Sequence, residues 1–97
     1  MRIPLNQIPM SGTHVVECEG RRVLLCRNQN GIHAMAEMCP HQMLSLDGGR
    51  VRGDVIMCPH HGARFSLDDG RSLSPLTTNG LTLYSVTPDG EDIVIGD

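Results

Sequence analysis

Aromatic residues are almost absent from this 97-residue chain, which contains one Phe, one Tyr and no Trp. A hydrophobic core must therefore be built from Val, Leu, Ile, Met and Ala. The sequence also has no apolar run long enough to cross a bilayer. Its N-terminus lacks the basic start and continuous apolar stretch of a signal peptide. We therefore expect a cytoplasmic protein with no membrane partner.

A strong net charge is missing as well. The formal charge is −3 with neutral histidines, and 20% of the residues are charged. Nucleic-acid binding requires a basic face that neutralises phosphates, so this mild acidity argues against a nucleic-acid partner. A chain this short buries only part of its apolar surface, and such chains often rely on a metal or on disulfides for stability.

Four cysteines are present, which could form two disulfides. Cytosolic thiols, however, stay reduced. Cys18 and Cys26 lie inside strand-like apolar runs, where we expect them to be small, buried core residues. Cys39 and Cys58 lie instead in turn-rich segments that also carry histidines.

Short apolar runs alternate with turn signals along the whole chain, a pattern typical of all-β proteins. Asn-Gly and Asp-Gly pairs favour tight hairpins because Gly adopts positive φ without steric cost. No segment shows a sustained helical period, and residues 6–10 are expected to form a single turn. The predicted fold is therefore a small antiparallel β sandwich or barrel. Its strands are expected at residues 2–5, 14–18, 22–27, 32–37, 54–57, 63–67, 81–87 and 92–95.

Cysteine and histidine occur together in two short motifs. Cys39 and His41 form C-x-H, and after sixteen intervening residues Cys58 and His61 form C-x-x-H. Each motif supplies one thiolate and one imidazole, and each follows a predicted strand. Such a set suits an iron–sulfur cluster in which two cysteines bind one iron and two histidines bind the other. We therefore predict these four residues as cluster ligands, and one-electron transfer as the chemistry.

Zinc is the main alternative, because two Cys and two His form a common tetrahedral zinc site. Zinc sites of this kind usually pair Cys with Cys and His with His. Here each motif carries one of each, and Pro follows both cysteines, which favours the iron–sulfur cluster. His60 occupies a spacer position of the second motif. It is expected to be a solvated neighbour of the site or, alternatively, a contact for a redox partner.

The two motifs, C-P-H and C-P-H-H-G, resemble the C-x-H and C-x-x-H signature of Rieske [2Fe–2S] proteins at closely similar spacing. The similarity covers nearly the whole chain, including residues 31–38, 62–65, 69–71 and 81–86. It implies one Rieske domain over residues 1–97, with an inserted cluster-binding part at about 38–80. That part would carry two ligand loops and a third loop that begins at Ser74 and Pro75; the alternative for Pro75 is a plain turn between two strands. The implied cofactor is one [2Fe–2S] cluster with two Cys on one iron and two His on the other.

The chain is similar, in particular, to free-standing ferredoxins of bacterial aromatic-ring-hydroxylating dioxygenase systems. Such ferredoxins take single electrons from an NAD(P)H-dependent flavoprotein reductase and deliver them to a terminal Rieske oxygenase. The resemblance implies the same two transient partners and a monomeric electron carrier that is not itself an enzyme. No histidine follows His61 to bind the second iron site of an oxygenase. The alternative is the small Rieske-like subunit of an assimilatory nitrite reductase.

Quinol-oxidising Rieske proteins carry an extra cysteine in each ligand loop, and the two form a disulfide. Leu44 and His60 stand at these positions here. Ala63 and Phe65 replace a serine and a tyrosine whose hydroxyls donate hydrogen bonds to the cluster or its thiolate ligand. Because fewer side chains donate hydrogen bonds to the cluster, the resemblance implies a reduction potential near the low end of the Rieske range, about −150 mV. Gly80 stands where the family often has a second proline.

Overall fold

The computed structural model describes residues 1–40, 43–60, 62–75 and 79–96, with residue 18 described by its backbone alone. Within these residues the chain forms three antiparallel sheets and no α-helix. One 3-10 turn, η1, spans Leu5–Gln7. The strands are β1 (Arg2–Pro4), β2 (Thr13–Cys18), β3 (Arg21–Asn28), β4 (Gly31–Ala36), β5 (Arg50–Arg52), β6 (Val55–Met57), β7 (Arg64–Ser66), β8 (Leu83–Tyr84), β9 (Val86–Asp89) and β10 (Asp92–Ile95).

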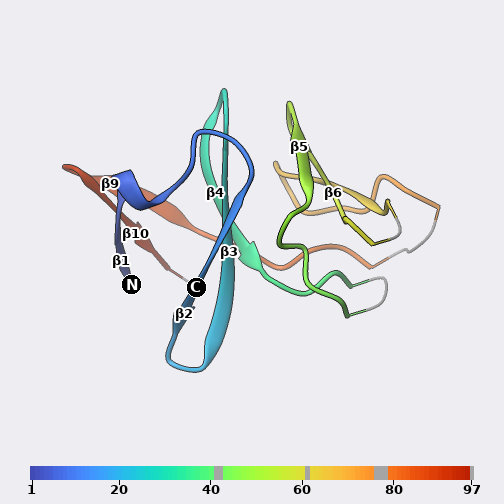
Figure 1. Cartoon of the computed structure of the whole chain (residues 1–97), viewed down its shortest axis with the longest axis horizontal. Coiled ribbons are helices and arrows are strands. Elements are labelled where there is room, and N and C mark those ends of the chain that lie inside the picture. The colour runs from blue at the N-terminus through green and yellow to red at the C-terminus, as the bar shows by residue number, and fades with distance from the viewer. Residues whose placement is uncertain (41–42, 61, 76–78, 97) are drawn as a thin grey trace.

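The three sheets follow one another along the molecule (Figure 1). The first sheet has the order β1-β10-β9, the central sheet β2-β3-β4-β8, and the third sheet β5-β6-β7. Strands β1 and β10 are hydrogen-bonded neighbours, and the Met1 amino group donates to the Ile95 carbonyl at 3.1 Å. The first two sheets thus form a base that brings the termini together, and the third sheet is inserted between β4 and β8 in the sequence.

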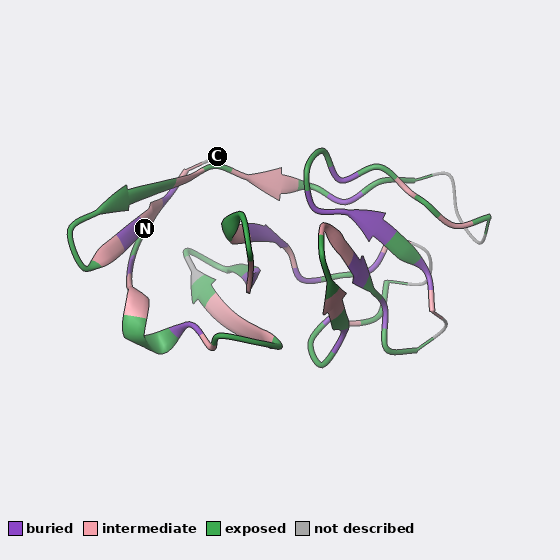
Figure 2. Cartoon of the chain, turned by 90° about the horizontal axis from the view of Figure 1, so that it is seen from above, coloured by how far each residue is buried: buried purple, intermediate pink, exposed green. Residues whose placement is uncertain are grey.

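The central sheet is covered on both faces. Four consecutive residues of β3, Val23, Leu24, Leu25 and Cys26, are buried. Because successive side chains of a strand point to opposite faces, Val23 and Leu25 pack toward the first sheet while Leu24 and Cys26 pack toward the third. The buried residues on the first side include Ile3, Ile8, Ala34, Ile93 and Ile95, and those on the other include Met35, Leu46, Ile56, Phe65 and Leu67. Figure 2 shows buried segments in all three sheets.

Polar contacts tie the inserted sheet to the base. Asn28 and Asn30, at the turn between β3 and β4, both donate to the Asp54 carboxylate, at 3.0 and 2.7 Å. Asn28 also donates to the Gly53 carbonyl at 2.9 Å. The turn between β5 and β6 is therefore held against the central sheet by side-chain hydrogen bonds.

The all-β prediction is confirmed, but three local details of it are wrong. The single strand expected at 81–87 is divided into β8 and β9, because β8 pairs with β4 and β9 pairs with β10. Strand β5 was not expected, since Val51 between two arginines offers almost no apolar alternation. The expected turn at 6–10 lies instead at Leu5–Gln7.

Candidate metal centre

The first cysteine motif begins a tight loop that starts just after β4. The Cys39 N–H donates to the Leu44 carbonyl at 2.7 Å, and the Met43 N–H donates to the Cys39 carbonyl at 2.7 Å. Met43 has a φ of 55°. A β-bridge between Met38 and Ser45 closes the base of this loop. The loop is therefore anchored on both sides by backbone hydrogen bonds.

The second motif begins a loop with the same hydrogen-bond pattern. The Cys58 N–H donates to the Ala63 carbonyl at 2.8 Å, and the Gly62 N–H donates to the Cys58 carbonyl at 3.1 Å. Gly62 has a φ of 75°. Cys58 directly follows β6, and Ala63 directly precedes β7. Each loop thus projects from the end of a paired strand, which gives it a rigid base.

Both cysteines are buried, Cys39 with 0% and Cys58 with 3% of its surface exposed. They belong to one buried cluster that also contains Ala63 and Phe65. None of the described cysteines Cys26, Cys39 and Cys58 forms a disulfide. Two thiols brought into one buried cluster by matched loops fit a metal centre that uses both as ligands.

His41 and His61, the other two predicted ligands, lie outside the described residues. Among the residues that the structure does describe, no group of three or more His, Cys, Asp or Glu gathers as a metal site. The described geometry therefore concerns the cysteine half of the centre, and the complete ligand set of four stays a prediction.

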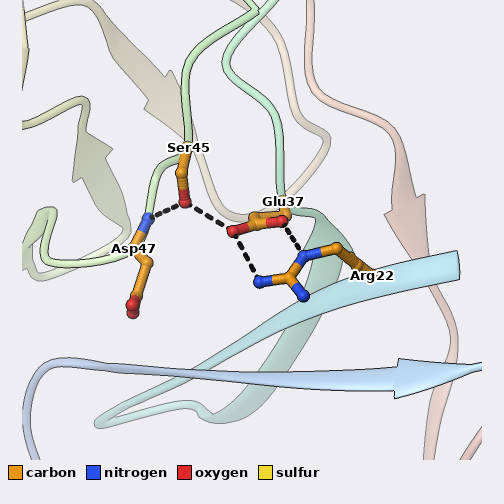
Figure 3. A network of polar contacts seen from close by, with 4 residues as sticks. All are labelled: Arg22, Glu37, Ser45 and Asp47. Carbon is orange, nitrogen blue, oxygen red and sulfur yellow. Dashed lines mark hydrogen bonds and ion pairs between the residues drawn. The ribbon is translucent and has the colours of Figure 1, made fainter.

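A buried carboxylate lies at the base of the first loop (Figure 3). Glu37 is 5% exposed and accepts hydrogen bonds from Arg22 Nε at 2.6 Å and from the Ser45 hydroxyl at 2.6 Å. These two bonds, that of Arg22 foremost, lower the pKa of the Glu37 carboxyl, against the opposing effect of its desolvation. Ser45 Oγ in turn accepts from the Asp47 N–H at 3.1 Å. Nothing in the sequence pattern singled out Glu37, because its partners come from separate segments.

The third expected loop is described only in part. Ser74 and Pro75 lie in a turn, and residues 76–78 are outside the described residues. The segment that follows this loop is hydrogen-bonded to Gly70, whose carbonyl accepts from the Leu81 N–H at 2.7 Å. A Cβ at Gly80 would come within 2.7 Å of that same Gly70 carbonyl oxygen. Glycine at position 80, in place of the proline frequent in the family, therefore permits a close approach of two backbone segments.

The other residues that the sequence analysis singled out lie in the core or at the surface, where the structure describes them. Cys26 is fully buried in β3, and this burial raises its thiol pKa to about 11, which confirms it as a core residue. The side chain of Cys18 is not described. His60 is exposed, and Leu44 is 39% exposed. No helix among the described residues is long and apolar enough to span a membrane.

The protein is all-β, with two buried thiols in matched loops at strand ends. Comparison with known proteins identifies its family. The sequence model of the Rieske [2Fe-2S] domain matches residues 3–85, and the chain belongs to the Rieske [2Fe-2S] domain family. Membership implies one Rieske-type [2Fe–2S] cluster, a cofactor that the two buried thiols fit.

Individual relatives are consistent with this assignment. The chain is 29% identical over 93 residues to the ferredoxin component of a naphthalene 1,2-dioxygenase system from Pseudomonas aeruginosa, covering 96% of this chain and 89% of the relative. Its fold matches the ferredoxin of carbazole 1,9a-dioxygenase from Nocardioides aromaticivorans IC177, with a TM-score of 0.89, 24% identity and coverage of 99% and 95% of the two chains.

Two further structures share the fold. One is a complex of reduced oxygenase and oxidised ferredoxin in carbazole 1,9a-dioxygenase, with a TM-score of 0.86, 24% identity and 97% coverage of both chains. The other is a proposed NADH-dependent nitrite reductase small subunit from Mycobacterium tuberculosis, with a TM-score of 0.82, 20% identity and coverage of 96% and 88%. Fold alone therefore does not separate these two kinds of protein.

Proposed function

We propose that the chain is the ferredoxin component of a Rieske oxygenase system. It carries single electrons from an NAD(P)H-dependent flavoprotein reductase to a terminal oxygenase. The observation that carries this proposal is the pair of buried cysteines, Cys39 and Cys58, held in two loops of the same geometry in a Rieske-family chain. Similarity along 96% of the chain to a dioxygenase ferredoxin supports the choice of system.

In this proposal Cys39 and Cys58 bind one iron, and His41 and His61 bind the other. The bound cluster supplies reversible one-electron redox chemistry. The chain's own residues hold the thiolates in a fixed position through the loop hydrogen bonds and exclude water from them by burial. Little rearrangement is then needed on electron transfer, which suits a carrier that performs no bond chemistry.

Contacts with the partners are expected to be small and short-lived, because a carrier must dissociate between transfers. Exposed apolar side chains occur on and beside the two ligand loops. Met43 and Leu44 lie in the first loop, Met57 directly precedes Cys58, and His60 is exposed in the second loop. We assign these residues to the docking surface for both partners, with the chain acting as a monomer.

The ligand assignment is tested by metal analysis and spectroscopy of anaerobically purified protein. The parent chain should contain two irons and two sulfides per chain, with the visible and electron paramagnetic resonance spectra of a Rieske cluster. Cys39→Ala and Cys58→Ala should abolish both. Cys26→Ala, which removes a buried thiol of the same cluster of residues, should keep them. Stoichiometric zinc in the parent would overturn the electron-transfer function.

The nitrite reductase alternative keeps a basis in the shared fold. It requires a stable, stoichiometric complex with a large sirohaem subunit, whereas a ferredoxin exchanges electrons as a separate chain. Size-exclusion chromatography with each candidate partner, followed by stopped-flow reduction, separates the two. Rapid reduction by a flavoprotein reductase without a stable complex supports the ferredoxin.

A further inference from the structure

The base of the first ligand loop contains a buried, paired carboxylate that plays no part in the electron-carrier function as described so far. Glu37 is 5% exposed and lies at the point where β4 ends and the loop begins. Since it precedes Cys39 by two residues, their Cα atoms lie within about 7 Å of each other. A charge at this place is close to the proposed cluster and poorly screened by solvent.

Glu37 joins three segments of the chain (Figure 3). Arg22 on β3 donates to it from Nε at 2.6 Å and from Nη2 at 3.4 Å. Ser45, the residue after the loop, donates at 2.6 Å to Glu37 Oε2, the oxygen that also accepts from Arg22 Nη2. Backbone bonds reinforce the junction, because the Glu37 N–H donates to the Arg22 carbonyl at 3.2 Å and its carbonyl accepts from Leu46 at 2.8 Å.

The two partners of the carboxylate differ in what they contribute. Ser45 is neutral and flanks the loop, so its bond closes the loop base. Arg22 is positive, but its side chain is 54% exposed while that of Glu37 is 6% exposed. Solvent therefore screens the arginine charge more than the carboxylate charge. On the buried side of the loop, the Arg22–Glu37 pair therefore produces a net negative electrostatic potential.

We propose that Glu37 is a positioning and potential-setting residue of the first ligand loop. Its bond to Ser45 fixes the loop base, and its negative charge, partly balanced by Arg22, disfavours the electron that is added on reduction. The inference rests on the proposed cluster at Cys39 and Cys58. The hydrogen bond to Ser45 affects how firmly the loop holds the cluster, whereas the charge of Glu37 affects the reduction potential. Different substitutions therefore test the two effects separately.

The charge effect is tested by the reduction potentials of Glu37→Gln, Arg22→Gln and the double variant, measured by protein-film voltammetry. Glu37→Gln keeps the shape and removes the negative charge, so its potential should rise. Arg22→Gln removes the balancing positive charge, so its potential should fall, by a smaller amount because of its exposure. In the double variant the larger rise should outweigh the smaller fall, so its potential should lie above that of the parent and below that of Glu37→Gln.

Asp89→Asn is the matched control, because it removes the carboxylate of another arginine pair, Arg2–Asp89 at 2.6 Å, in the first sheet. It changes the net charge by the same amount as Glu37→Gln, and its potential should equal that of the parent. Equal shifts in the control and in Glu37→Gln would overturn a local role of Glu37. So would shifts of the same sign in Glu37→Gln and Arg22→Gln.

The positioning effect is tested by Ser45→Ala, which keeps both charges and removes the loop-side hydrogen bond. A hydrogen bond to a charged group contributes enough stability that its removal should be measurable. In Ser45→Ala, cluster absorbance should be lost about tenfold faster in mild urea. The reduction potential should stay that of the parent. An unaltered rate of loss would overturn this part. If the Glu37→Gln variant takes up no cluster, Arg22→Gln alone tests the charge effect, because its reduction potential must fall below that of the parent. A parent chain that binds no cluster would instead refute the proposed function itself.

Discussion

Met43 and Gly62 occupy the same position in the two ligand loops. Each lies four residues after a buried cysteine and donates its N–H to that cysteine's carbonyl. Each has positive φ, 55° for Met43 and 75° for Gly62. Glycine adopts this conformation without strain, whereas a residue with a Cβ does so at a cost of about 1 kcal/mol or more.

Met43→Gly should therefore stabilise the protein, although the greater freedom of glycine in the unfolded chain offsets part of the gain. We expect the free energy of unfolding to rise by about 0.5 to 1 kcal/mol, measured by urea denaturation of the cluster-loaded protein. Met43→Ala, which removes the exposed side chain and keeps the Cβ, is the control and should leave stability nearly unchanged.

Gly62→Ala provides the opposite test, since it introduces a Cβ where φ is 75°. Among the described residues other than its chain neighbours, the nearest atom to that Cβ would be Met57 Sδ at 4.0 Å, an ordinary contact. We therefore expect a loss of about 1 kcal/mol, which is the cost of the backbone conformation for a residue with a Cβ. Stabilisation by Gly62→Ala, or destabilisation by Met43→Gly, would show that the loops do not share this conformation.

Cys26 should be chemically inert in the folded protein. It is fully buried, and its thiol pKa is raised to about 11, so at pH 8 only about one molecule in a thousand carries the reactive thiolate. Mass spectrometry after brief iodoacetamide treatment should find Cys26 unmodified in the native chain and modified in urea. Cys26→Ala should cost about 1 kcal/mol through the small cavity it leaves. Rapid native alkylation would contradict the burial.

The elements that the sequence predicted are those with a local signal. The all-β class followed from short apolar runs between turns, and the buried pair Cys39 and Cys58 was singled out by residue type and spacing. The division between β8 and β9 was not predictable in this way, because the apolar alternation runs through Ser85 while the pairing partner changes from β4 to β10.

The contacts of Glu37 with Arg22 and Ser45, and the backbone strain at Met43, could not be predicted from the sequence, for different reasons. The partners of Glu37 come from β3 and from the segment after the first loop, and only the fold brings Arg22 and Ser45 to the same carboxylate. Methionine carries no sequence signal for positive φ, unlike glycine or asparagine. Both features depend on tertiary structure, and both lie beside the predicted ligands.

Gly80 should be intolerant of any side chain. A Cβ at this position would lie 2.7 Å from the Gly70 carbonyl oxygen, which is backbone and accepts a hydrogen bond from Leu81. Gly80→Ala must therefore displace one of two backbone segments, and we expect a loss of about 1 to 3 kcal/mol. Gly12→Ala is the comparison, because within the described part of the chain no atom beyond its chain neighbours lies within 4 Å of its Cβ, and its φ of 84° imposes conformational strain. Urea denaturation measures both, and a smaller loss for Gly80→Ala than for Gly12→Ala would contradict the close approach.

We expect Ala63 and Phe65 to set the hydrogen-bond environment of the proposed cluster, because their side chains offer no donor. Both are fully buried in the same cluster of residues as Cys39 and Cys58. Ala63→Ser and Phe65→Tyr each add one hydroxyl there, and a hydrogen bond to a cluster or thiolate sulfur favours the reduced state. At about 1 kcal/mol for one bond, each potential should rise by roughly 40 mV for a one-electron couple.

Ser66→Ala is the matched control for these two variants, because it removes a nearby buried hydroxyl that accepts from the Asp68 N–H at 3.2 Å. Its potential should stay that of the parent, which we expect near −150 mV, the low end of the Rieske range. Protein-film voltammetry of all four proteins decides the matter. A parent value well above zero would show that missing donors at positions 63 and 65 do not lower the potential. Unchanged potentials in both hydroxyl variants would place those side chains out of reach of the sulfur ligands.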